Sequence, residues 1–181
     1  VDGSQSANKT VHYGVAVYES AASNVTVRNL VVTDWTHGVH LEGATGVIVE
    51  DVTAATNRVG VVLHGATDSV VRGATVTDST VHGVRLKAGA NGNLVDDSEV
   101  TRSGKHGVFL NNAGENTFRD VTVSASAKQG FKFGSGSLSS GGHDDGETHD
   151  DLESGVSHTD DGHDDCGQGV RTTGNVVDGA V

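Results

Sequence analysis

The sequence predicts an all-β repeat protein, built as a solenoid of short coils. A four-residue phrase recurs six times: a Gly, an apolar residue, any residue, and a second apolar residue. The phrase begins at Gly14, Gly38, Gly60, Gly83, Gly107 and Gly130. Successive glycines are 24, 22, 23, 24 and 23 residues apart, a fixed period that is typical of stacked repeats. The composition agrees, because 26 Gly, no Pro and many Val and Thr residues favour strands and tight turns.

Each repeat contains three short strand patterns, in which apolar residues alternate with polar ones as half-buried strands require. The first pattern is the Gly-led phrase itself. The second occupies residues 25–28, 47–50, 69–72, 93–96 and 116–119. The third follows a polar or Gly corner, at Asn29, Asp51, Gly73, Asp97 and Asp120. We therefore expect six to seven coils of 22–24 residues, each with three short strands.

Stacking of such coils places the same position of every repeat in one row. Two apolar rows are expected inside: Val15, Val39, Val61, Val84, Val108 and Phe131, and Val17, Leu41, Leu63, Leu86, Leu110 and Phe133. An outward row alternates in charge along Arg28, Glu50, Arg72, Asp96 and Arg119. We interpret this outward row as a ladder of ion pairs that favours the correct register between coils.

These patterns resemble the right-handed parallel β-helix, the fold of the pectate-lyase-like superfamily. The resemblance covers residues 10–133 and implies the fold, whereas the fold itself hosts many activities. Residues 1–9 are polar and are expected to form an irregular N-terminal segment. Residues 169–181 repeat the earlier apolar pattern, so they look like the start of a further, truncated coil. Residues 134–168 then form an insertion, Gly/Ser-rich and then His/Asp-rich, which we expect to be mobile because it has almost no apolar residues.

The charge distribution excludes several classes of function. The net charge is −12, but residues 143–165 hold 10 of the 24 acidic residues and none of the 12 basic ones. The basic residues do not form a stripe interleaved with aromatic residues, so the sequence does not indicate nucleic-acid binding. No apolar stretch is long enough to span a membrane, and the single Cys excludes an internal disulfide framework.

The outer face of the Gly-led strands is the first candidate site. A uronate lyase or epimerase must neutralise a carboxylate, remove a proton and supply another, which Arg, Lys, His and Tyr side chains can do. The candidate catalytic residues are Lys87, Arg85 and His64. The candidate substrate-binding residues are Tyr18, His40, Glu42, His82, His106 and Asn111. The alternative is that these positions are solvated outer residues of a tolerant repeat.

Hydrolysis fits this face less well than lyase or epimerase chemistry. Only Glu42 is acidic there, so the pair of carboxylates that most glycoside hydrolases use is not evident. The clustered Asp calcium site of pectate lyases is also missing from this face.

The insertion is the second candidate site, because four His residues alternate with Asp pairs. Imidazole suits Zn, Cu and Ni, whereas carboxylates suit Ca. The candidate metal ligands are His143, Asp145, His149, Asp151, His158, Asp161, His163 and Asp165. The alternative is an acidic loop without any defined site.

Two classes of function follow, and the sequence leaves open whether the chain is an enzyme. The leading hypothesis is an extracellular, cell-surface or periplasmic β-helix protein that binds or modifies an acidic polysaccharide. The alternative is a non-enzymatic module, either structural or adhesive, or a metal-handling accessory. The last version resembles the periplasmic β-helix family that assists copper-site maturation in nitrous oxide reductase, whose degenerate repeats are of the same type.

Overall fold

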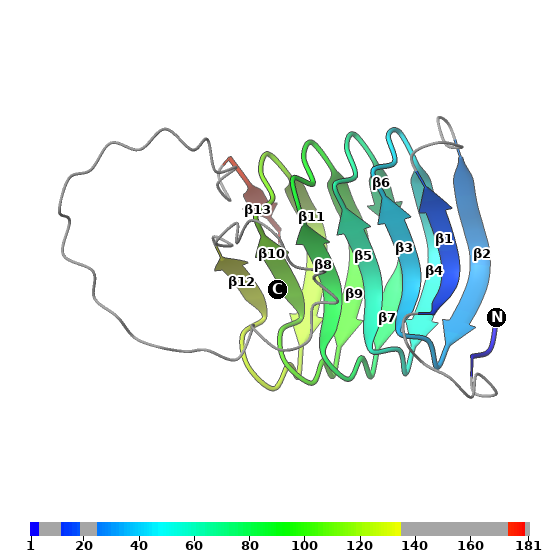
Figure 1. The fold of residues 1–181 in the computed structure, drawn as a ribbon. Helices are drawn as coiled ribbons and strands as arrows, with labels where there is room; N and C mark the ends of the chain where they lie inside the picture. The colour runs from blue at the N-terminus through cyan, green and yellow to red at the C-terminus, as the bar shows by residue number, and fades with distance from the viewer. Residues whose placement is uncertain (4–11, 19–24, 135–173, 180–181) are drawn as a thin grey trace, which may run out of the picture. The chain divides into compact units, whose positions relative to one another are not determined.

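The computed structural model describes residues 1–3, 12–18, 25–134 and 174–179. Within these ranges every paired strand is parallel, and the strands form two sheets that face each other across the core (Figure 1). The first sheet runs β1-β3-β5-β8-β10-β12, and the second runs β13-β11-β9-β6-β4-β2, with β7 paired to β4 and β9. The described residues contain no helix that is long and apolar enough to cross a membrane.

The strand bounds follow the predicted repeat. The first sheet consists of β1 (Tyr13–Tyr18), β3 (His37–Glu42), β5 (Val59–His64), β8 (His82–Lys87), β10 (Val108–Asn111) and β12 (Phe131–Gly134). The second sheet consists of β2 (Thr26–Thr33), β4 (Ile48–Ala55), β6 (Val70–Arg72), β7 (Thr75–Thr77), β9 (Leu94–Thr101), β11 (Thr117–Ser124) and β13 (Val176–Asp178). Every strand of the first sheet therefore contains or overlaps one Gly-led phrase.

The parallel solenoid is confirmed, but it has about five turns and two main sheets rather than six to seven coils of three strands. The second and third predicted patterns form one bent strand in β2, β4, β9 and β11. The predicted corner lies inside each bend. The corner residues have φ between 43° and 59°, namely Asn29, Asp51, Gly73, Asp97 and Asp120. A left-handed residue turns the chain while pairing continues on both sides of it, so only Gly73 separates two strands, β6 and β7.

The last described strand also corrects the expected number of coils. Residues 174–179 were expected to lie in a seventh coil. Instead β13 pairs with β11, with Val176 opposite Thr117, while β12 pairs with β10. Strand β13 therefore takes the second-sheet position of the coil that β12 begins, and in the sequence the predicted insertion falls within that coil.

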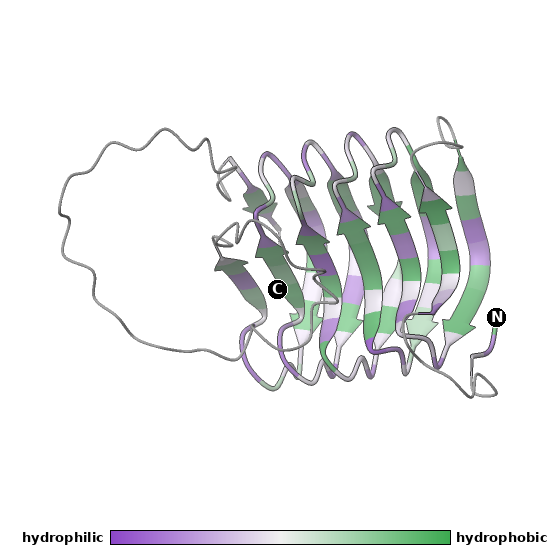
Figure 2. Cartoon of the chain, in the orientation of Figure 1, coloured by the Kyte–Doolittle hydropathy of each residue, from purple (hydrophilic) through white to green (hydrophobic). Residues whose placement is uncertain are grey.

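The two predicted internal rows are confirmed by the strand register. Val39 lies opposite Val61, and Leu41 lies opposite Leu63, and the four residues are 0% exposed. Figure 2 shows apolar segments recurring along the strands of the first sheet. Each such buried aliphatic side chain contributes roughly 1.5–3 kcal/mol relative to an exposed one. The ends of the rows are less buried: Val15 and Phe131 are partly buried, and Phe133, on the last strand of the first sheet, is 46% exposed.

A buried asparagine ladder, which the sequence analysis did not identify, joins successive coils. Asn93 and Asn116 are 1% and 0% exposed, and Asn175 continues the row. The backbone N–H of Ser69 donates to Asn93 Oδ1 at 3.0 Å, that of Asn93 to Asn116 Oδ1 at 3.1 Å, and that of Asn116 to Asn175 Oδ1 at 2.9 Å. The recurring Asn at the start of the second strand pattern was the signal for this ladder.

The glycine of the repeated phrase is required by a close approach across the coil. A Cβ added to Gly83 would overlap Val100 Cγ1 from the opposite sheet and would lie 2.7 Å from the carbonyl oxygen of Gly107. Gly60 and Gly107 meet equivalent neighbours. Any side chain at these positions would therefore push the two sheets apart.

We predict that Gly83→Ala destabilises the solenoid, because overpacking a close-packed core costs about 1–3 kcal/mol. Thermal unfolding should show a lower Tm, by about 2–4 °C for each kcal/mol. Gly130→Ala is the matched control in the same row, since its added Cβ would lie 3.6 Å from the nearest atom, Val123 Cγ1. Equal effects of the two substitutions would contradict the close-approach argument.

The predicted charge ladder is also confirmed. Successive members lie opposite each other in the register, along Arg28, Glu50, Arg72, Asp96 and Arg119. Arg72 Nε donates to Glu50 at 2.9 Å, and Arg119 donates to both Asp96 carboxylate oxygens at 2.6 and 2.8 Å. The hydrogen bonds from Arg119 lower the pKa of Asp96 below its ordinary value. The stabilisation of the fold by the Arg119–Asp96 ion pair is fully present above the ordinary aspartate pKa of about 3.9. It is lost as the pH falls through the lowered pKa of Asp96.

Asp96→Lys should lower the Tm, because it places a third cation between Arg72 and Arg119. The deficit should shrink when salt is added, since salt screens exposed charges. Glu99→Lys makes the same charge change on β9, but its register neighbours are Thr75 and Thr122. Melting curves at low and high salt test the difference, and a salt-independent deficit would contradict an electrostatic ladder.

Candidate functional site

The outer face of the first sheet carries the nine predicted site residues, and four of them are buried. His40 is 2% exposed, His82 1%, Arg85 7% and His106 8%. The alternative of freely solvated outer residues is therefore wrong for these four positions. Two buried valines, Val59 and Val62, lie between the histidines of β3 and those of β8 and β10. The single predicted patch is thus divided into two clusters.

The first cluster is built around His40 on β3. Alternation along the strand puts His40 and Glu42 on the same face, and the register puts His64 of β5 beside Glu42. One ligand atom from each of these three residues lies within 4.8 Å of the others. His40 Nε2 is 3.3 Å from Glu42 Oε2. We call His40, Glu42 and His64 the His40 site.

Aromatic rings from two other strand positions surround His40. Tyr13 stacks on it with ring centroids 4.5 Å apart, and His37 stacks on it at 5.0 Å with an interplanar angle of 10°. His64 meets it edge-on at 6.1 Å, and Tyr18 lies at 6.4 Å. These contacts fix the imidazole plane before any ligand arrives.

Burial keeps the imidazoles of His37 and His40 neutral. Burial, followed by the charges of His40 and Lys87, lowers the pKa of His37 to about 3. Burial also lowers the pKa of His40 to about 4, although the hydrogen bond to Glu42 acts in the opposite direction. Both rings are therefore uncharged near neutral pH, which is the form in which imidazole ligates metals.

The proton positions in this cluster allow two arrangements. His37 Nδ1 and His40 Nδ1 are 3.1 Å apart, so one of them carries a proton that it donates to the other. If His37 carries it, a neutral His40 donates Nε2–H to Glu42. If His40 carries it, His40 Nε2 presents a lone pair toward Glu42. The second arrangement leaves His40 Nε2 ready to act as a ligand atom.

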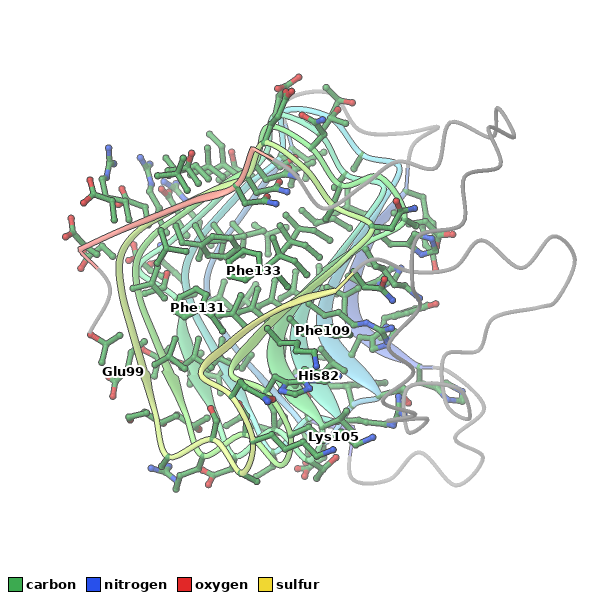
Figure 3. The ribbon with its side chains drawn as sticks, turned by 90° about the vertical axis from the view of Figure 1, so that its left-hand side faces the viewer. His82, Glu99, Lys105, Phe109, Phe131 and Phe133 are labelled. Carbon is green, nitrogen blue, oxygen red and sulfur yellow. The ribbon has the colours of Figure 1, made fainter. Side chains whose placement is uncertain are left out.

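The second cluster, which we call the His82 cluster, comprises His82, Arg85, His106 and Phe109. The rings of His82 and His106 are stacked at 5.2 Å and 8°. Phe109 packs against them at 4.9 and 5.4 Å, and Arg85 Cζ lies 5.6 Å from its ring centroid. Figure 3 shows His82, Phe109 and Lys105 close together on one side of the coil. Burial, then the charge of Arg85, lowers the pKa of His82 to about 3.

The predicted site residues are divided between the two clusters. Tyr18, His40, Glu42 and His64 meet in the first cluster, and Arg85, His82 and His106 meet in the second. In the register, Lys87 lies between His64 and Asn111. Tyr13, His37 and Phe109 also belong to these clusters but were not named as site residues from the sequence. The available signal was their position: Tyr13 and His37 directly precede the Gly of the phrase, and Phe109 is its third residue.

The candidate metal ligands of the insertion lie outside the described residues. They are His143, Asp145, His149, Asp151, His158, Asp161, His163 and Asp165. Binding of Ca, Zn, Ni or Cu by that segment stays a prediction from the sequence.

Comparison with solved structures confirms the parallel β-helix. A mutant of the periplasmic alginate epimerase AlgG matches with a TM-score of 0.60 and 19% identity, over 73% of this chain and 37% of that chain. A second AlgG structure matches with a TM-score of 0.51 and 17% identity over the same shares. At this identity the likeness shows the fold alone. No curated protein matches the chain.

A family model described as "Periplasmic copper-binding protein (NosD)" matches residues 2–140 of the 181. The family is described as periplasmic, which agrees with the expected extracellular, cell-surface or periplasmic location. Since the family model spans well over half of the sequence, the chain belongs to the NosD family.

Proposed function

We propose that this chain is a non-enzymatic, copper-binding β-helix module and that copper is its cargo, held at the His40 site. The observation that carries the proposal is the convergence of His40, Glu42 and His64 within 4.8 Å. Imidazole nitrogen suits copper, and membership of a family described as copper-binding supports that metal over the others.

Each residue of the site has a distinct role in this proposal. His40 and His64 supply imidazole nitrogens, and the Glu42 carboxylate offsets the charge of the metal ion. His40 is 2% exposed, so it presents its ligand atom at the floor of the site. Tyr13 stacks on the His40 ring and restricts its rotation.

His37 is a positioning residue in the same scheme. Its Nδ1 lies 3.1 Å from His40 Nδ1, where it can accept the His40 Nδ1–H. With copper bound, this hydrogen bond would hold His40 in the form whose Nε2 is free of a proton. Partners of this kind fix the orientation of ligating imidazoles, and their loss typically weakens metal affinity about 10–100-fold.

We predict that His64→Phe removes high-affinity copper binding, because it deletes one of the two imidazole ligands. His37→Phe keeps a stacked ring but deletes the Nδ1 acceptor, so it should weaken binding by about 10–100-fold. Competition with a chromogenic copper chelator measures both effects. His106→Phe is the matched control, since it changes a histidine of the His82 cluster on the same sheet.

The insertion provides the outcome that would overturn this assignment. A variant with His143, His149, His158 and His163 replaced by Asn retains the His40 site intact. If this variant loses copper while His64→Phe retains it, copper binds to the insertion instead. Equal binding by wild type and His64→Phe would also contradict the His40 site.

A second candidate function is binding or modification of an acidic polysaccharide on the same face. It is favoured by Arg85 and Lys87, which the alternation of β8 places on the outer side, and by the lyase or epimerase chemistry that such cations can support. Arg85→Ala with Lys87→Ala should then abolish retention of the chain on immobilised polygalacturonate. Retention that is equal in the double variant and the wild type would exclude the hypothesis.

We also propose that the coils wind in the right-handed sense that the resemblance to pectate-lyase-like proteins implies. Crossover connections between parallel strands of one sheet are right-handed in about 98% of cases.

A further inference from the structure

We infer that the His82 cluster is a second binding site, separate from the His40 site, for an anionic oxygen ligand of the carboxylate or phosphate class.

The backbone fixes the proton positions of both histidines. The His106 N–H donates to His82 Nδ1 at 3.4 Å, and the Gln129 N–H donates to His106 Nδ1 at 3.4 Å. An imidazole whose Nδ1 accepts a hydrogen bond carries its proton on Nε2. The two rings therefore present Nε2–H donors and not the lone pairs that a metal ion needs.

One of these donors is buried without an acceptor. His82 is 1% exposed, and its Nε2 has no hydrogen-bond partner among the described residues. Buried polar groups in native proteins almost always have such a partner. Because the His82 and His106 rings are parallel within 8° and accept from the backbone in the same way, their Nε2–H groups face the same side. The cluster thus offers the buried His82 Nε2–H to an oxygen acceptor.

The charges around His82 select an anion. Arg85, His106 and Lys105, in that order, are the side chains whose charge acts on the His82 imidazole, and none of them is acidic. Arg85 is 7% exposed, and its guanidinium lies over Phe109, so it is held in the same cluster as the donors. A guanidinium beside N–H donors matches the geometry of carboxylate and phosphate oxygens.

The two clusters on this sheet therefore differ in the groups that face the imidazoles. At the His40 site, the imidazole nitrogen faces the Glu42 carboxylate, and ligand atoms of three residues converge. At the His82 cluster, Nε2–H groups and cations gather. Val59 and Val62, which are 1% and 0% exposed, lie between the two sets of side chains.

The test is a titration of the ¹⁵N-histidine-labelled full chain with sodium glucuronate and, separately, with inorganic phosphate, followed by NMR. The proposal expects the His82 Nε2–H resonance to shift saturably with at least one anion. His82→Phe keeps a ring against His106 and Phe109 but deletes the donor, so it should weaken binding at least tenfold by calorimetry. Tighter binding of glucuronate assigns the carboxylate class, and tighter binding of phosphate assigns the other.

His64→Phe is the matched control, because it alters the His40 site and should leave anion binding unchanged. Copper binding by His82→Phe should likewise equal that of the wild type, so failure of the copper proposal and failure of this one are distinguishable. Absence of any shift at His82 with either anion in the wild type would overturn the proposal, and so would equal anion affinity of His82→Phe and the wild type. The wild-type titration decides the matter even if the variant does not fold.

Discussion

In-register hydrogen bonding between parallel strands of successive coils is the interaction on which the rest of this structure depends. It places equivalent residues of neighbouring coils directly opposite each other, at the roughly 4.8 Å spacing of paired strands. The aliphatic rows, the asparagine ladder and the charge ladder are all consequences of that single alignment. A shift of the register by one residue would turn each row of side chains to the other face. The glycines permit close approach of the sheets, and the ladders favour one register. Both features therefore support the same alignment.

The same alignment explains why two chemically distinct clusters occupy one face. A row of outward positions passes from tyrosine and histidine in the first coils, through valine, to histidine and glutamine in the later ones. Neighbours in the row stack because the coil spacing is close to ring-stacking distance. Where a carboxylate enters the adjacent row, as at Glu42, the imidazoles gain an acceptor. Where Arg85 and Phe109 enter it, the imidazoles have cationic and aromatic neighbours instead.

Much of this fold could be predicted from the sequence, because a fixed period determines which residues become neighbours. The internal rows, the positions of the corners and the charge ladder all followed from counting residues. The burial of His40 and Arg85 could not be predicted, since period-two alternation shows which face a side chain occupies and not what packs around it there. The pairing of β13 could not be predicted either, because its sequence resembles the second strand of every coil. The sequence therefore does not identify which strand it pairs with.

The pairing of β13 with β11 shows that one coil is completed by residues distant from its start in the sequence. Residues 135–175 separate the two strands of that coil, yet Asp178 lies opposite Arg119 and extends the alternating charge row. The entropic cost of closing a flexible loop grows slowly with its length, by about 0.6 kcal/mol for each doubling. This point of the solenoid can therefore accept segments of very different length while the flanking strands stay in place. Evolution could exchange the intervening sequence at this position without rebuilding the coils on which the two histidine clusters depend.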